Sequence, residues 1–161
     1  MLFGRFKISS NIIFYQTALS AAFVNLRPIV PGHVLITPKR IVPLMADLSE
    51  DEYLDMWKTV RVVQAALGKH YGTSSYNVAV QDGKSAGQSV PHVHVHILPR
   101  STGDFERNDD VYDELQDWAP RQEMADTKPK LEVPEDDDRK DRTPEKMAAE
   151  AAVYREILNA D

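Results

Sequence analysis

The chain contains no cysteine among its 161 residues, which excludes a disulfide scaffold and any zinc or iron–sulfur site built on thiolates. It has no excess of basic residues, since 25 Asp and Glu outnumber 19 Lys and Arg and the net charge is −6. A protein that wraps duplex DNA or RNA is therefore not expected, whereas a small phosphorylated ligand remains compatible. The longest apolar runs, residues 18–24 and 29–37, are much shorter than the roughly 18 residues of a membrane-spanning helix, so no membrane partner is expected.

The first ten residues lack the apolar core and the small-residue cleavage site of a secretory signal. A soluble intracellular location is the resulting expectation, in the cytoplasm and also in the nucleus or mitochondria. The composition, 42% hydrophobic and 27% charged, is that of an ordinary globular protein. A chain of this length suffices for one domain with a buried core and a tail.

The texture of the sequence divides the chain into three parts. Residues 1–118 carry strand and helix patterns and are predicted to form the domain. Residues 119–144 hold four Pro, eight acidic and six basic residues, a composition typical of a disordered, acidic loop. Residues 145–161 are predicted to form a helix that docks on the domain or on a second subunit. Its apolar stripe consists of Met147, Ala151, Tyr154 and Leu158.

Short apolar segments bounded by Pro, Gly, Ser and Asn predict an antiparallel meander of about five strands. One or two edge strands are expected near the N-terminus, followed by a pair joined by a tight turn and by two later strands. The segments are residues 2–8, 11–16, 19–26, 33–37, 75–81 and 90–98.

One long helix is predicted between these strands. Ser49 and Glu52 form a capping box, apolar residues then recur at helical spacing to Leu67, and Gly68 is expected to end the helix. A short helix capped by Asn108 or Asp109 should follow the last strand. Strands and helices in this arrangement predict an α+β fold, with a twisted sheet packed against the long helix and with C-terminal helices.

Three of the five histidines alternate with apolar residues after Pro91, as His92, His94 and His96. In a strand, alternate side chains share a face, so these imidazoles would point one way and the valines between them the other way. Three histidines along one face cost stability without a return in packing, because each buried ring needs hydrogen-bond partners. The cluster therefore indicates chemistry.

Two chemistries compete at this cluster. A metal ion cannot readily reach all three rings, because the outer pair of a strand would stand roughly 13 Å apart. A pair of them with His33 or His70 could bind one ion. In the other interpretation His94 is a nucleophile, since a neutral imidazole can displace a leaving group from phosphorus and form a phosphoramidate that water cleaves.

The loop at residues 83–90 lies directly upstream and combines glycines, hydroxyls and backbone amides, which makes it a candidate anion nest. Negative charge on the leaving group could be shared by His96, Gln81, the loop amides and magnesium or manganese that arrives with the substrate. No carboxylate cluster marks a dedicated metal site, and no tightly bound cofactor is expected.

These residues resemble a known family. The run from His92 to Leu98 looks like the complete histidine triad pattern of the HIT superfamily, and several segments around it resemble the fragile histidine triad branch. The resemblance extends from about Phe3 to Trp118 and returns at residues 147–154. The segments are residues 28–35, 81–83, 86–90, 98–100, 103–105 and 108–109, together with Asn25.

The resemblance implies a homodimeric dinucleoside polyphosphate hydrolase that splits diadenosine triphosphate into AMP and ADP. His94 would become adenylylated, His92 would orient it, and His33 would support the catalytic ring. His96 and Gln81 would contact the phosphates, while Asn25 would hold the ribose. The remaining implied contacts are Phe6 at the rim of the site and Gly87, Gln88, Ser89 and Val90 along the phosphate loop.

Other interpretations remain open. A uridylyltransferase of the superfamily would replace the third histidine by glutamine, and an aprataxin-like protein would need a cysteine-containing zinc module. A phosphoramidase of the Hint type would cleave adenosine phosphoramidate but usually ends soon after the triad. A nucleotide-binding signalling module with slow turnover would use the same site, and its long-lived nucleotide complex would be the signal.

Overall fold

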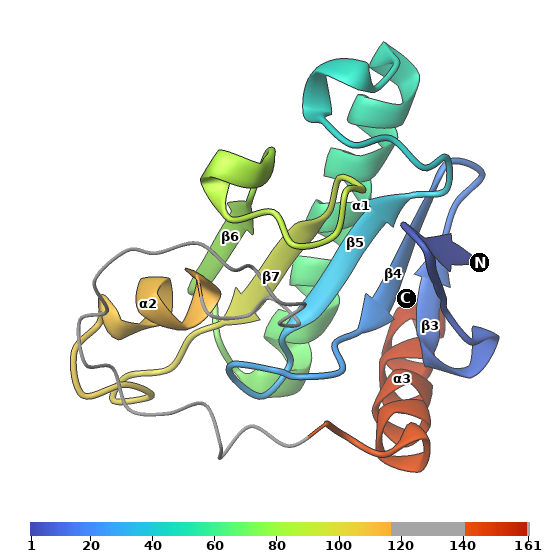
Figure 1. Cartoon of the computed structure of the whole chain (residues 1–161). Coiled ribbons are helices and arrows are strands. Elements are labelled where there is room, and N and C mark those ends of the chain that lie inside the picture. The colour runs from blue at the N-terminus through green and yellow to red at the C-terminus, as the bar shows by residue number, and fades with distance from the viewer. Residues whose placement is uncertain (117–140, 161) are drawn as a thin grey trace.

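The computed structural model describes residues 1–116 and 141–160 and contains one five-stranded antiparallel sheet (Figure 1). The strand order is β3-β4-β5-β7-β6, so the expectation of five antiparallel strands is confirmed but the meander is interrupted. The long helix leads the chain from β5 to the far edge of the sheet, where β6 forms. The last strand, β7, then fills the place between β5 and β6. The strands are β3 (Ile13–Gln16), β4 (Ser20–Val24), β5 (Val34–Pro38), β6 (Tyr76–Val80) and β7 (Val95–Pro99).

The central strands have two faces of different character. Residues paired directly across an antiparallel sheet point to the same face. Phe23 pairs with Leu35, and Leu35 pairs with His96, so these three residues share one face. The other face is a continuous apolar core that packs on the long helix. It includes Ala22, Val24, Val34, Ile36, Val95 and Ile97.

The long helix α1 (Glu50–Tyr71) begins as the sequence predicts. Ser49 Oγ accepts the Glu52 N–H at 3.2 Å, and the Glu52 carboxylate accepts the Ser49 N–H at 2.9 Å. The prediction that Gly68 ends the helix is wrong, because the helix continues to a left-handed Gly72 with φ 65°. Gly68 is required for space, since a Cβ there would lie 2.7 Å from Tyr76 Oη.

The N-terminal segment forms a small hairpin of its own, β1 (Leu2–Phe3) and β2 (Phe6–Lys7), followed by the 3₁₀ turn η1 (Ser10–Ile12). The hairpin covers the face of the sheet opposite α1. The Phe3 ring packs edge-on against Phe23 with centroids 5.4 Å apart and joins Leu35 in a second apolar cluster. The hairpin therefore encloses the face that carries His96.

Two helices follow the last strand. Helix α2 (Asp110–Gln116) buries Val111 and Leu115, and Trp118 lies outside the described residues with most of the expected acidic loop. Helix α3 (Pro144–Asn159) follows Thr143, whose hydroxyl accepts the Lys146 N–H, and it buries Met147, Ala151 and Tyr154 in the main core. Figure 1 shows α3 beside β3, away from α2. Over the described ranges, no helix has the length and apolar character needed to cross a bilayer.

Replacing Gly68 by alanine tests the close approach of α1 to β6. Alanine inside a helix ordinarily stabilises by about 1 kcal/mol relative to glycine. Here we expect a loss on the order of 1 kcal/mol in the free energy of unfolding, because the new methyl group meets Tyr76 Oη and the Thr73 carbonyl. Urea denaturation measures the change, and adding Tyr76→Phe should recover part of it. A Gly68→Ala protein more stable than the parent would contradict this packing.

Candidate active site

His94 is held by a hydrogen bond that decides its tautomer. Its Nδ1 lies 2.8 Å from the His92 carbonyl oxygen, which can only accept. The proton of the neutral ring is therefore on Nδ1 and the lone pair is on Nε2. The ring is 99% buried, with Phe3 packed edge-to-face on it at 5.1 Å.

The strand that should carry all three histidines is shorter than predicted. β7 begins at Val95, so His92 and His94 precede it. Pro91 has no N–H, and the Val93 N–H donates to the Val42 carbonyl at 2.8 Å instead of to a sheet neighbour. The alternation nevertheless continues, because the valines of this segment lie in the main core while the imidazoles lie outside it.

The His92 ring is held entirely by backbone groups. The Gly4 N–H donates to its Nδ1 at 3.0 Å, so Nε2 carries the proton and donates to the carbonyls of Pro38 and Arg40 at 2.9 and 3.1 Å. The ring thus joins the N-terminal hairpin to the end of β5. His92 is hydrogen-bonded to His94 through its backbone carbonyl oxygen and not through its ring.

His33 and His96 form a directed pair. The Ile29 N–H donates to His33 Nδ1 at 3.1 Å, which leaves the proton on His33 Nε2. That proton is donated to His96 Nδ1 at 2.9 Å, so His96 carries its own proton on Nε2. His96 thereby presents an N–H and His94 a lone pair on Nε2, with ring centroids 5.0 Å apart.

Burial keeps these rings neutral. Desolvation lowers the pKa of His94 to about 4, although its hydrogen bond to the His92 carbonyl acts in the opposite direction. Burial, reinforced by the neighbouring His94 and His33, holds the pKa of His96 well below its usual range. Burial also lowers the pKa of His92. The nucleophile is therefore unprotonated at neutral pH.

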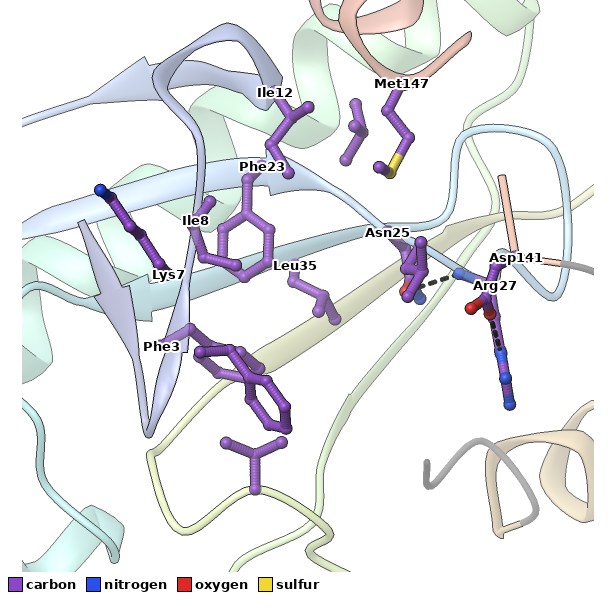
Figure 2. A pocket seen from close by; sticks show the side chains of 14 residues that line it. Phe3, Lys7, Ile8, Ile12, Phe23, Asn25, Arg27, Leu35, Asp141 and Met147 are labelled. Atoms are coloured by element: carbon purple, nitrogen blue, oxygen red, sulfur yellow. Dashed lines mark hydrogen bonds and ion pairs between the residues drawn. The ribbon is translucent and has the colours of Figure 1, made fainter. Parts of the chain in front are cut away.

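A mostly apolar pocket of about 370 Å³ adjoins the histidines (Figure 2). Phe3 forms part of its wall and also packs on His94, which connects the two. Asn25 is the buried polar residue of the lining, while Phe6 is 39% exposed at the rim. The other lining side chains include Ile8, Ile12, Phe23, Leu35, Val90 and Met147. This combination suits a flat base with a sugar attached.

The loop before the triad is folded on itself. The N–H groups of Ala86, Gly87 and Gln88 donate to carbonyls of Gly83 and Lys84, so these three amides are occupied within and just after the turn η3 (Lys84–Ala86). The Gln88 amide donates to the Pro43 carbonyl at 2.8 Å. Ser89 Oγ is buried and has no hydrogen-bond partner among the described residues, which suits a ligand oxygen.

Gln81 lies between this loop and α2. Its Nε2 donates to the Leu115 carbonyl at 3.2 Å, and its buried Oε1 has no hydrogen-bond partner in the described part of the chain. Gly87 is left-handed, with φ 87°, and a Cβ there would lie 2.7 Å from Gln81 Nε2. Glycine therefore lets the loop approach the Gln81 amide closely.

The geometry disfavours the metal interpretation. His33 and His96 share a hydrogen bond through the nitrogens that would bind an ion, and His70 packs on Tyr71 and Tyr154 across the sheet. Within residues 1–116 and 141–160, no group of three or more potential ligands is arranged to hold a metal ion.

The sequence pattern does not predict the contacts that several other residues make with the site. Gly4 and Ile29 act through backbone N–H groups, which any residue other than proline supplies. Phe3 is one apolar residue among many. Arg142 lies in the segment assigned to the acidic loop, yet its guanidinium donates to the Asn25 carbonyl.

A comparison with known protein families shows to which family the chain belongs. Residues 6–103 match the HIT domain. The chain belongs to the HIT family. The bifunctional bis(5'-adenosyl)-triphosphatase/adenylylsulfatase FHIT of Arabidopsis thaliana is 47% identical over 98% of this chain and 83% of its own length. The bis(5'-nucleosyl)-tetraphosphatase (asymmetrical) of Schizosaccharomyces pombe is 44% identical over 94% of this chain and 90% of its own.

A solved HIT-fold structure agrees with these sequence matches. The crystal structure of Plasmodium falciparum diadenosine triphosphate hydrolase in complex with Cyclomarin A superimposes with a TM-score of 0.76. It is 28% identical, and the match covers 99% of this chain and 84% of that chain. The identified branch and the α+β fold are confirmed.

The lowered histidine pKa values predict a pH-dependent stability. Between about pH 6.5 and about pH 4, the unfolded chain binds protons that the folded His94 does not, so stability is full above this window and falls as the pH drops through it. The His94 shift corresponds to roughly 3 kcal/mol. Urea unfolding across the window measures the slope. His94→Gln should reduce the slope and leave the part due to His92 and His96, and an unchanged slope in that variant would contradict the assignment.

Proposed function

We propose that this chain is a dinucleoside polyphosphate hydrolase that cleaves diadenosine triphosphate to AMP and ADP with His94 as the nucleophile. The observation that carries the proposal is the hydrogen bond from His94 Nδ1 to the His92 carbonyl, which presents a neutral imidazole with its lone pair on Nε2. The names of the Arabidopsis relative and of the Plasmodium structure support the substrate.

The reaction follows from this tautomer. His94 Nε2 attacks the α-phosphorus, a P–N bond forms, and the P–O bond to ADP breaks. The ring becomes cationic, and its Nδ1–H remains on the His92 carbonyl, whose negative end stabilises the positive charge. Water then attacks the same phosphorus, the P–N bond breaks and its electron pair returns to Nε2. AMP leaves with the water oxygen, and the proton lost by that water passes to solvent.

The surroundings of His94 divide between the two halves of the substrate. The apolar pocket would take the base, with Phe6 at its rim and Asn25 near the ribose. The phosphates would meet His96 Nε2–H, Gln81 and Ser89, while the close turn at Gly87 lets them lie near the loop. Magnesium or manganese would accompany the polyphosphate and neutralise part of its charge, with no resident cofactor.

The name of the Arabidopsis relative also favours adenylyl sulfate as a substrate. The Arabidopsis relative is also named an adenylylsulfatase. Adenylyl sulfate offers the same adenylyl group with sulfate as the leaving group, so attack by His94 would give the same covalent intermediate. The S. pombe relative's name similarly favours a test of tetraphosphates.

A homodimer is part of the proposal. β6 is an edge strand of the sheet, and its outer backbone groups can pair with a second copy. Val78 on this strand is 37% exposed, and Leu54 on α1 is also exposed. An antiparallel pairing of two β6 strands around a twofold axis would extend the sheet across both subunits.

The central test is turnover of the purified protein on four substrates, with chromatography of the products. The substrates are diadenosine triphosphate, diadenosine tetraphosphate, adenylyl sulfate and adenosine phosphoramidate. We expect rapid release of AMP and ADP from the triphosphate and a loss of roughly 10⁴-fold or more in His94→Ala, because the nucleophile is removed. An acid-quenched sample should carry an adenylyl group on His94.

His70→Ala is the matched control, because His70 is an exposed histidine on α1 outside the site. It should leave the rate within about twofold of the parent. A His94→Ala rate above a few per cent of the parent would refute the nucleophile. Preference for the phosphoramidate would indicate a Hint-like enzyme, and tight nucleotide binding with very slow turnover would indicate a signalling module.

The dimer is tested by Val78→Asp. A charge on the edge strand opposes pairing with an identical strand, so we expect this variant to elute as a monomer while the parent elutes as a dimer. Size-exclusion chromatography with light scattering measures the mass. Val153→Asp on α3 introduces the same charge at another exposed valine and should remain dimeric. A monomeric parent protein would contradict the proposal.

A further inference from the structure

The segment just before α3 returns to the end of β4. The Arg142 N–H donates to the Leu26 carbonyl at 3.1 Å. Its guanidinium donates to the Asn25 carbonyl through Nη2 at 2.7 Å and through Nε at 3.2 Å. Three hydrogen bonds thus join two segments that are 117 residues apart in the chain.

The guanidinium is held from its other side as well. Arg142 forms an ion pair with Glu150 on α3, and both side chains are largely buried, at 20% and 17% exposure. Glu150 Oε1 also accepts the Tyr154 hydroxyl at 2.6 Å, and the Tyr71 hydroxyl donates to Tyr154 at 2.7 Å. This series of hydrogen bonds and the ion pair hold the Arg142 side chain against the core. The guanidinium therefore has a fixed position relative to the Asn25 carbonyl.

The residue that Arg142 holds is the buried polar residue of the pocket. Asn25 is 1% exposed, and its Nδ2 lies 3.3 Å from the ring nitrogens of His33. Its Oδ1 accepts the Arg27 N–H at 3.2 Å. Figure 2 shows Asn25 at one end of the pocket beside Arg27 and Asp141. A shift of its backbone would move its amide relative to a bound sugar.

We propose that Arg142 is a positioning residue for the nucleoside half of the substrate, acting through the Asn25 carbonyl; this inference rests on the proposed function. Its hydrogen bonds and its ion pair go to Leu26, Asn25 and Glu150. The hydrogen bonds that set the His94 and His33 tautomers are made to the His92 carbonyl and the Ile29 N–H, and neither of these groups contacts Arg142. Loss of Arg142 therefore weakens nucleotide binding while the chemical step is largely retained.

The experiment measures KM and kcat for diadenosine triphosphate, and the Kd of AMP by calorimetry. Arg142→Ala should raise KM and Kd by about tenfold or more, as expected for a lost charge-assisted hydrogen bond, with kcat within about threefold. Arg142→Lys keeps the charge and should recover part of the loss. In an Asn25→Ala background, Arg142→Ala should change Kd by less than about twofold, because the side chain it positions is absent.

Arg155→Ala is the matched control. Arg155 lies on α3, the helix to which Arg142 is joined through Glu150. Like Arg142 it donates to backbone carbonyls, those of Asn11 at 2.6 Å and Ile13 at 2.7 Å, so its loss loosens the docking of α3. It should lower the melting temperature with KM within about twofold of the parent. An equal rise of KM in Arg155→Ala would assign the effect to general loosening of α3 and overturn the proposal.

The remaining outcomes separate this inference from the proposed function. If the parent binds AMP but cleaves none of the substrates, the hydrolase is refuted and the AMP affinities still test Arg142. If the parent is active and Arg142→Ala keeps its KM and Kd, only the positioning role is refuted. Glu150→Gln gives a second route, since it removes the ion pair with little change of shape and should raise Kd in the same direction.

Discussion

Four buried imidazoles can share this site only because backbone groups set where each proton lies. A buried ring with an unsatisfied nitrogen, or with a charge, costs several kcal/mol. The His92 carbonyl, the Gly4 N–H and the Ile29 N–H between them specify which nitrogen of each ring is protonated. The result is one acceptor and one donor side by side, His94 Nε2 and His96 Nε2–H, in a region where neither ring becomes cationic at neutral pH. The main-chain positions therefore decide which of the two imidazoles accepts and which donates.

That arrangement requires the two faces of the sheet to differ. One face packs on α1 in a continuous apolar core, which holds β5 and β7 rigidly in register. The other face is covered by the N-terminal hairpin, where Phe3 contacts Phe23 and His94. The same aromatic ring therefore contributes to the burial that lowers the pKa of His94 and also forms a wall of the pocket.

The features that depend on local pattern could be predicted from the sequence. Alternation gives the strands, Ser49 and Glu52 give the start of α1, and three alternating histidines indicate the reactive cluster. The errors have physical reasons. The local pattern predicts that Gly68 ends the helix. Glycine is required there because the Tyr76 side chain leaves no room for a Cβ. The predicted histidine strand is too long, because the Val93 N–H donates to the Val42 carbonyl instead of to a sheet neighbour. No local pattern predicts this hydrogen bond. Arg142 was missed because its contact with Asn25 spans most of the chain.

The contacts of the site also divide between chemistry and recognition. In the proposed reaction the triad segment and the turn containing His33 would supply the nucleophile and the donor, and they hold each other through short-range and sheet contacts. The pocket proposed for the nucleoside is completed by segments from both ends of the chain, the hairpin that contains Phe6 and the segment that precedes α3. Substitutions at the two ends can therefore change which nucleotide binds while leaving the tautomers of His94 and His96 intact.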